Sequence, residues 1–245
     1  MKVYITGDTH GEFSGFGAKV FDAPPGSIVI ICGDFGGVWD NSQREKYWLD
    51  WLSEKPYLFL FADGNHENYD LLKTYPVSVW NGGKVQFIRD NILHLMRGQI
   101  FNIENKHFFV FGGARSHDIS AGILSKDDPE FTAKRKRLDR EMALYRIDHE
   151  SWWKEEMPSE EEKEEGLKNL EKVDFKVDYI ISHCTPSSVQ DIISGGMFGH
   201  DDLTDYLDTV KEKCAFEKWF FGHYHDNKMI GNRFVLLYEY IYKLI

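Results

Sequence analysis

The chain has 245 residues, of which 42% are hydrophobic and 28% charged, a composition typical of a folded globular protein and not of a disordered one. Its length suits one large domain, or a core domain with an insertion, and is sufficient to bury a substantial core. The formal net charge of -11 argues against a large nucleic-acid footprint, because such binding needs Lys and Arg to neutralise phosphates, but it leaves small phosphorylated ligands open.

Five apolar runs predict buried strands, and each run ends in a turn that carries Asp, Asn or His. In an open α/β sheet, ligands gather at the carboxyl ends of the strands, so the five turns are expected to converge on one point. Glycines in these turns permit sharp bends and close backbone approach. In chain order, the runs and their turns are 3–6 with Gly7-Asp8-Thr9-His10-Gly11, 28–32 with Gly33-Asp34-Phe35-Gly36, 57–61 with Asp63-Gly64-Asn65-His66-Glu67, 179–181 with Ser182-His183-Cys184, and 219–221 with Gly222-His223-Tyr224-His225.

Helices are expected between the first strands. Apolar spacing predicts a helix over residues 41–54, with Asn41 or Ser42 as the N-cap, and Pro56 stops it. A short helix is expected to begin at Asp70. Strand, helix and strand in succession favour parallel strands with covering helices.

The character of the chain changes between residues 84 and 111. Residues 92–96, 99–103 and 107–111 are interpreted as short strands, and Glu104-Asn105-Lys106 is typical of a hairpin turn. We therefore expect antiparallel strands in the middle of the chain. A second sheet packed on the first follows from this interpretation.

Residues 115–172 interrupt the strand pattern with charged, helix-prone sequence, which predicts a helical, cap-like insertion within a single domain. Mixed-sign charge runs of this kind are usually the solvated face of a helix, and the alternative is a cap whose Arg side chains touch substrate. Beyond the insertion, 188–193 and 202–214 predict helices, and 228–240 predicts a hairpin that turns at Gly231-Asn232.

Cysteine usage and the N-terminus predict a compartment. The three cysteines, Cys32, Cys184 and Cys214, form no CxxC pair and no even framework, which favours a reducing, cytoplasmic setting. Met1 and Lys2 lead straight into the first strand without a signal segment. No apolar run approaches the length of a membrane span, so no membrane association is expected.

The polar residues at the strand ends form a set of potential metal ligands. Carboxylate oxygens, imidazole nitrogens and an amide oxygen, without a thiolate, suit first-row divalent or trivalent metals. The set exceeds the need of one open catalytic metal, whereas two metals that share a carboxylate would use it fully. Such a pair, about 3.5–4 Å apart, clamps a phosphoryl group for in-line attack. The set consists of Asp8, His10, Asp34, Asn65, His183, His223 and His225.

These motifs, from Asp8-Thr9-His10 through Gly33-Asp34 and Gly64-Asn65-His66-Glu67 to His183 and Gly222-His223-Tyr224-His225, resemble the calcineurin-like metallophosphoesterase family. They occur in the family's order, and no metal-ligand position is missing. We therefore expect a four-layer α/β/β/α sandwich of two mixed sheets, with the helical insertion, over the whole range 1–245.

The resemblance implies a role for each residue of the set. Asp8, His10 and His225 would hold one metal, Asn65, His183 and His223 the other, and Asp34 would bridge them. A hydroxide between the metals would attack phosphorus, because two Lewis acids lower the pKa of bound water. His66 takes no metal, and in the family it protonates the leaving oxygen or binds the phosphate.

One departure from the family concerns the branch of Ser/Thr protein phosphatases. In that branch an Asp three residues after the bridging carboxylate orients the catalytic His, and an Arg follows it. Here those positions are Gly37 and Val38, which argues against membership of that branch. Another group must then orient His66, and Asp40 and Asp63 are both candidates.

The expected activity is hydrolysis of a small phosphate monoester or diester with two metal ions. Mn and Fe are the favoured metals, with Zn and Ni as alternatives. Arg115 and His117, just after the Gly112-Gly113 turn, are candidates for substrate contact. The rival functions are a non-catalytic interaction module on the same fold and a nuclease, which the acidic balance disfavours. A thiol nucleophile at Cys184 is not expected, because the metal interpretation already uses the adjacent His. The sequence leaves the oligomeric state undefined.

Overall fold

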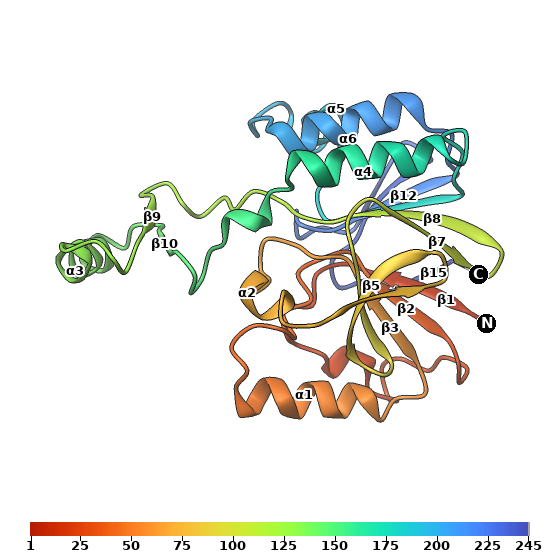
Figure 1. The fold of residues 1–245 in the computed structure, drawn as a ribbon, viewed down its shortest axis with the longest axis horizontal. Helices are drawn as coiled ribbons and strands as arrows, with labels where there is room; N and C mark the ends of the chain where they lie inside the picture. Colours follow the sequence, from red (N-terminus) through yellow and green to blue (C-terminus); the bar gives the residue numbers. More distant parts are fainter. Residues whose placement is uncertain (245) are drawn as a thin grey trace.

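The computed structural model describes residues 1–244, which fold into two packed β-sheets with helices on their outer faces (Figure 1). In the first sheet, β1, β2, β3 and β6 run parallel, and the outer strands pair antiparallel with their neighbours. Its order is β15 (Tyr242–Lys243), β1 (Val3–Thr6), β2 (Ile28–Ile31), β3 (Leu58–Phe61), β6 (Ile92–Leu95), β5 (Gly83–Arg89) and β4 (Val77–Trp80).

The second sheet has four parallel central strands and an antiparallel strand at each edge. Both predicted hairpins are confirmed, and the left-handed backbone of Glu104 and Asn105 closes the tighter one. The order is β13 (Lys228–Ile230), β14 (Phe234–Leu236), β12 (Lys218–Phe221), β11 (Tyr179–Ser182), β8 (Lys106–Phe111) and β7 (Gln99–Ile103).

The core between the sheets explains why the strands read as continuous apolar runs. Ile5, Ile30 and Leu60 point from the first sheet toward Phe108 and Ile181 of the second, and all five are buried. Alternate residues of the same strands face the covering helices instead. Both faces of each central strand are therefore buried, which removes the alternation of polar and apolar residues.

Helices complete the four layers. On the first sheet lie α1 (Gln43–Ser53), α2 (Tyr69–Leu72) and the short 3-10 helix η1 (Ser14–Phe16). On the second sheet lie α4 (Glu160–Glu171), α5 (Ser187–Ser194) and α6 (Asp202–Lys213). Figure 1 shows α1 on one side of the paired sheets and α4, α5 and α6 on the other. The predicted α/β/β/α sandwich of two mixed sheets is confirmed.

Local sequence sets the start of α1. The Ser42 side chain accepts the backbone N–H of Glu45 at 3.2 Å, so Ser42 is the N-cap and Asn41 is not. The Glu45 carboxylate in turn accepts the N–H groups of Trp39, Asp40 and Asn41. One side chain thus fixes the loop that precedes the helix.

The prediction for the middle of the chain is partly wrong. Strand β6 belongs to the first sheet, where it pairs parallel with β3, and only β7 and β8 of this region lie in the second sheet. The hairpin of β4 and β5 was not predicted, although Asn81-Gly82 is a typical turn pair. Strand β4 is an exposed edge, with Val77 56% and Val79 72% exposed, so it carries no buried apolar pattern.

Residues 115–172 contain two different parts. In the first, which we call the arm (residues 118–152), β9 (Ile123–Leu124) pairs parallel with β10 (Arg146–Ile147), and α3 (Phe131–Glu141) packs on them. Figure 1 shows the arm extending away from the sandwich. The second part contains α4, which covers the second sheet. The boundaries of a single insertion over 115–172 stay a prediction.

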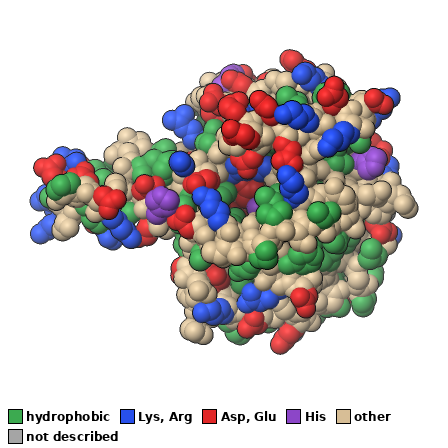
Figure 2. Space-filling view, in the orientation of Figure 1, with side chains coloured by type: hydrophobic (Ala, Val, Ile, Leu, Met, Phe, Trp, Pro, Cys, Tyr) green, Lys and Arg blue, Asp and Glu red, His purple; other side chains and the backbone are tan. Residues whose placement is uncertain are grey.

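Charge on the arm is mixed. Figure 2 shows Lys and Arg side chains interspersed with Asp and Glu along it. On α3, Arg135 pairs with Asp139, and Lys134 pairs with Asp128 in the segment that precedes the helix. This pattern agrees with a solvated helix face.

Aromatic packing and ion pairs tie the base of the arm to the sandwich. Trp153 is fully buried, meets the ring of Trp39 edge-on at 5.4 Å and donates from Nε1 to Asp70. His149 Nδ1 lies 2.7 Å from the same carboxylate, at the N-terminus of α2. The docked position of the arm therefore depends on Asp70.

The contact between His149 and Asp70 is expected to depend on pH. The hydrogen bond to Asp70 raises the pKa of His149, and the negative charges of Asp148 and Glu155 add to the effect. Because the folded pKa is raised, the contact stabilises the docked arm below the ordinary pKa of His and is lost as pH rises through the raised pKa. In an NMR titration, Asp70→Asn is expected to lower the pKa of His149. The pKa of His200, which Asp191 raises, serves as a reference and should not move.

Two further expectations concern cysteines and membranes. Cys32, Cys184 and Cys214 are buried and free. Burial raises the pKa of the Cys184 thiol, which agrees with the expectation that it is no nucleophile. Within residues 1–244, none of the helices has the length and apolarity that a membrane crossing requires.

Candidate metal centre

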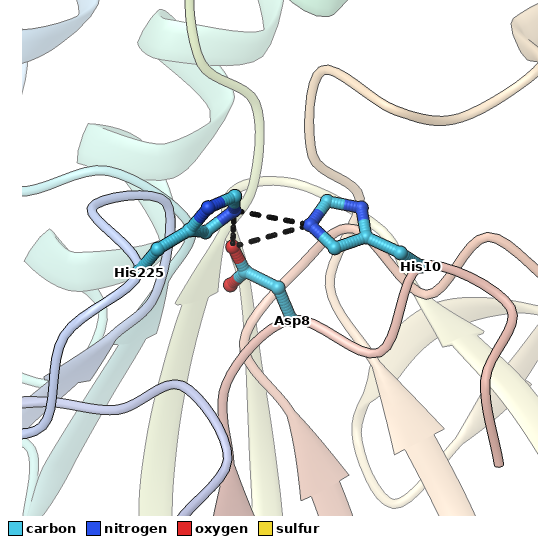
Figure 3. Close-up of side chains that lie close together, drawn as sticks. All are labelled: Asp8, His10 and His225. Atoms are coloured by element: carbon cyan, nitrogen blue, oxygen red, sulfur yellow. Dashed lines mark hydrogen bonds and ion pairs between the residues drawn. The ribbon is translucent and has the colours of Figure 1, made fainter.

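One half of the predicted ligand set meets at the carboxyl ends of β1 and β12. His10 Nε2 and His225 Nε2 lie 3.1 Å apart, and His225 Nε2 lies 3.2 Å from Asp8 Oδ2. His10 Nε2 is 3.9 Å from the same oxygen. Figure 3 shows the two imidazoles and the carboxylate pointing toward one another from three directions. A cation fits among these atoms.

The other half forms around His183 at the end of β11. His183 Nε2 lies 3.3 Å from Asp34 Oδ1 and 3.2 Å from Asn65 Oδ1. Nδ1 of the same ring lies 2.7 Å from the carbonyl oxygen of Cys32, which can only accept, so Nδ1 carries the proton. That hydrogen bond orients the ring so that Nε2 points at the oxygens of Asp34 and Asn65, where it donates when protonated and where it would hold a metal ion when not.

Asp34 links the two halves. Its Oδ2 lies 3.8 Å from His10 Nδ1, while its Oδ1 faces His183 and accepts the backbone N–H of His66 at 2.7 Å. Burial alone would raise the pKa of Asp34, but the facing His183 holds it well below its usual range, with smaller contributions from His66 and His10. Asp34 is therefore a buried carboxylate that stays ionised.

His223 is the last of the seven predicted metal ligands. Its backbone N–H donates to both oxygens of Asp8, at 3.0 and 3.1 Å, and its ring lies edge-on to His183 at 5.0 Å between centroids. Within the described chain, the structure thus brings all seven predicted ligands to one place between the two sheets.

Several of these ligands have a left-handed backbone conformation, which orients their side chains. His10, Asp34, His223 and His225 have φ between 46° and 69°, a region that non-glycine residues rarely adopt. Such conformations persist only where the surrounding structure imposes them, and they cluster at functional sites. The sharp turns at the strand ends are the cause here.

Two glycines leave room for the carboxylates. A Cβ added at Gly64 would overlap Asp34 Oδ1, and one added at Gly222 would overlap Asp8 Oδ1. Neither position has space for any side chain. The glycines of these motifs therefore serve close packing against the ligands.

Gly222→Ala is expected to displace Asp8 and to destabilise the protein by about 1–3 kcal/mol, the usual cost of overpacking. Urea unfolding would measure the loss of stability, and mass spectrometry the loss of bound metal. Gly199→Ala is the matched control, because a Cβ at Gly199 meets nothing within 4 Å. Equal stability and metal content in both variants would contradict this account of Gly222.

His66 is half-buried beside the carboxylate Asp34. In the described chain, neither carboxylate considered from the sequence hydrogen bonds to its ring. Asp40 Oδ1 accepts the N–H of Ser42 instead, and Asp63 is directed away into the interior. No orienting partner for His66 follows from these two residues.

Asp63 anchors a buried network that was not predicted. Its carboxylate accepts from Arg97 Nε at 2.7 Å and from the hydroxyl of Tyr69 at 2.9 Å, and His94 Nε2 lies 3.2 Å away. Arg97 also donates to the backbone carbonyls of Glu155 and Glu156. His94 is thus a buried histidine whose ring nitrogens lie within hydrogen-bond distance of Gln86 and Asp63. An Arg that directly follows the strand 92–96 was the only sequence signal for this network.

Arg115 and His117 lie beside the metal ligands. His117 Nε2 is 2.6 Å from His223 Nε2, and both His117 and Arg115 line a cavity of about 400 Å³. The segment is held by Glu156, a buried carboxylate that accepts the N–H and hydroxyl of Ser116. Both residues are therefore positioned near anything bound at His223.

The donor atoms fit metal ions. The imidazole nitrogens of His10 and His225 lie 3.1 Å apart beside the buried carboxylate of Asp8, an arrangement that suits a shared cation. Three overlapping groups of His and Asp side chains are close enough to hold an ion.

A four-layer sandwich with Asp, Asn and His side chains gathered where the strands of both sheets end defines a class of metal-dependent hydrolases. The family model described as calcineurin-like phosphoesterase matches residues 1–227. The chain belongs to this family, as its motifs predicted. The family implies divalent metal ions as cofactors.

Comparisons beyond the family are more distant. No curated protein matches the chain significantly. Among solved structures, phosphopantetheinyl hydrolase from Mycobacterium tuberculosis is similar, with a TM-score of 0.45 and 15% sequence identity over 97% of this chain and 90% of that one. This similarity carries no argument about the substrate.

Proposed function

We propose that the chain is a phosphoesterase that hydrolyses a small phosphate monoester or diester with two bound metal ions. The observation that carries the proposal is the convergence of seven donor side chains, one of which is the buried carboxylate Asp34 that lies between the other six. No single metal uses seven protein ligands and keeps a position open for substrate. Two metals that share Asp34 account for the whole set.

The proposed first metal is held by Asp8, His10 and His225, and the second by Asn65, His183 and His223. Mn and Fe suit these ligands best, with Zn and Ni as alternatives. When bound, two such metals would polarise the phosphoryl group and lower the pKa of a water molecule between them. The buried carboxylates Asp8 and Asp34 supply the negative charge that the cations need.

Other side chains would act on the substrate itself. His66 is not one of the seven proposed metal ligands. Its ring is therefore free to donate a proton to the leaving oxygen or a hydrogen bond to the phosphate. His117 and Arg115 border the opposite side, where they would contact phosphoryl oxygens or the group that stays on phosphorus.

Two rival functions are weaker. A non-catalytic interaction module would not need the complete ligand set or His66. A nuclease would need a basic surface for the phosphate backbone, whereas the net charge is -11 and the arm carries charges of both signs. The cavities beside the ligand set, about 250 and 400 Å³, favour a small substrate.

The test combines metal content with turnover. Purified protein would be assayed for bound metal by mass spectrometry, and for hydrolysis of p-nitrophenyl phosphate and bis(p-nitrophenyl) phosphate after addition of Mn. About two metals per chain with turnover supports the proposal, and the preferred ester separates monoesterase from diesterase. Absence of metal and turnover after reconstitution with Mn, Fe, Zn or Ni would favour the interaction module. A polynucleotide cleavage assay tests the nuclease.

A further inference from the structure

A second feature adjoins the candidate metal centre on the side of His66. It is a cavity of about 250 Å³, which we call the tryptophan cavity. Its lining includes two histidines, three aromatic rings and the charged residues Asp40, Arg44 and Glu45. The lining residues that matter here are His10, His66, Phe13, Trp39, Trp48 and Arg44.

Two aromatic contacts border the cavity, and one of them includes His66. The Trp39 ring lies 6.4 Å from the His66 ring between centroids, and Phe13 meets Trp48 edge-on at 6.1 Å. Phe13 is buried, while both tryptophans are half-buried and keep part of their rings accessible. Arg44, in the first turn of α1, is exposed at the rim.

The cavity is built from fixed parts. The loop that carries Trp39 is held by Glu45, as described above, and Asn68 Nδ2 donates to the Trp39 carbonyl from the other side. Its floor depends on glycines, because a Cβ at Gly36 would overlap the backbone of Gly11. A rigid wall of this kind loses little conformational entropy when a ligand binds.

The proposed role of His66 indicates which part of the substrate would enter the tryptophan cavity. If His66 protonates the leaving oxygen, that oxygen lies within hydrogen-bond reach of its ring. The carbon skeleton attached to this oxygen must then extend to the same side, away from His117 and His223. The tryptophan cavity is the space that the structure provides there.

We propose that the tryptophan cavity binds the leaving alcohol of the substrate and selects for one that carries a flat aromatic ring, either an aryl group or a nucleobase. This inference rests on the proposed phosphoesterase function. Aromatic side chains present stacking faces and edges that a saturated group does not use as well. The volume is below the 300–1,000 Å³ typical of drug-sized ligands, so one ring system fits better than an extended chain.

The test compares pairs of esters whose leaving oxygens are chemically alike. Adenosine 5′-monophosphate is paired with ribose 5-phosphate, and benzyl phosphate with ethyl phosphate, or the methyl diesters of each if the chain is a diesterase. The wild-type protein is expected to favour the aromatic member of at least one pair by about tenfold or more in kcat/KM. The pair that shows the larger ratio tells a nucleobase from an aryl group.

Variants then locate the preference. Trp48→Ala and Trp39→Ala are expected to reduce the ratio about tenfold, and Trp48→Phe to retain most of it. Trp80→Ala is the matched control, because Trp80 is likewise half-buried but lies on β4, outside the cavity. The ratio is measured within each variant, so partial unfolding or metal loss cancels. Inhibition by adenosine or benzyl alcohol, compared with ribose or ethanol, provides a second readout that does not depend on turnover of an aromatic ester.

The outcomes separate this inference from the function on which it rests. Turnover of both members of each pair at equal kcat/KM would overturn the inference and leave the phosphoesterase function intact. An aromatic preference that survives both alanine substitutions would also overturn it. Absence of metal and of all turnover in the wild-type protein would instead overturn the proposed function, and the inference with it.

Discussion

Asp34→Asn is expected to reduce hydrolysis of any phosphate ester by roughly 10³-fold or more. The substitution keeps the shape of the side chain and an oxygen for the N–H of His66, but it removes the charge. That charge faces His183 on one side and His10 on the other, so its loss affects both proposed metal sites at once. Bound metal, measured by mass spectrometry, is expected to fall together with turnover.

The control for Asp34→Asn is Asp226→Asn. Asp226 is exposed and directly follows the proposed ligand His225, yet among residues 1–244 its Oδ1 accepts only the N–H of the next residue, Asn227. The control variant should keep its metal and its rate. Asp34→Asn with a full complement of metal and wild-type turnover would rule out Asp34 as the shared ligand, and circular dichroism would show whether either variant is unfolded.

The sheet core was predictable because its signal is local. Strands β1, β2, β3, β11 and β12 are buried on both faces, so each is a short apolar run bounded by turn residues. The polar residues that follow were predictable for the same reason, since parallel strands end at one edge. The structure places the ligands that follow β1, β2 and β3 in the first sheet and those that follow β11 and β12 in the second, so their meeting also depends on how the two sheets pack.

Other parts depend on partners that are distant in the sequence. The apolar run of β6 gives no sign that it pairs with β3 in the first sheet, since a buried strand looks alike in either sheet. The exposed edge strand β4 has too little burial to produce a pattern. The same holds for Asp63, which the sequence offered as a partner of His66 and the structure pairs with Arg97, 34 residues away.

The tryptophan cavity, which adjoins the candidate site, also depends on residues that are distant in the sequence. Trp39 and Trp48 read as ordinary apolar positions, one in a loop and one on α1, and only the fold sets them around His66. Likewise Ser116 gave no signal, although the buried Glu156 holds its backbone and so positions the adjacent Arg115 and His117. Ligand types were thus readable from the sequence, whereas the shape around them was not.

His66→Ala is the second variant with a large expected effect. It should lower the rate on esters with poor leaving groups by about 10²–10⁴-fold, the usual contribution of a general acid, and leave the bound metal unchanged. The difference from Asp34 follows from the proposed ligand set, in which His66 has no metal to hold. The backbone N–H of His66 donates to Asp34, and its ring, although it lies close to His10 and Asp34, is not one of the seven proposed ligands. His107→Ala, an exposed histidine on β8, is the control.

The dependence of the rate on the leaving group distinguishes the two proposed roles of His66, proton donation and phosphate binding. A proton donor matters little when the leaving alcohol is acidic, as in p-nitrophenyl esters, and greatly when it is a simple alkyl alcohol. The rate of His66→Ala should therefore fall more steeply with the pKa of the leaving alcohol than that of the wild type. His66→Gln, which can donate a hydrogen bond but not a proton, should behave like His66→Ala. If His66→Gln restored the rate on alkyl esters, the ring would bind phosphate and the proton would have to come from another group.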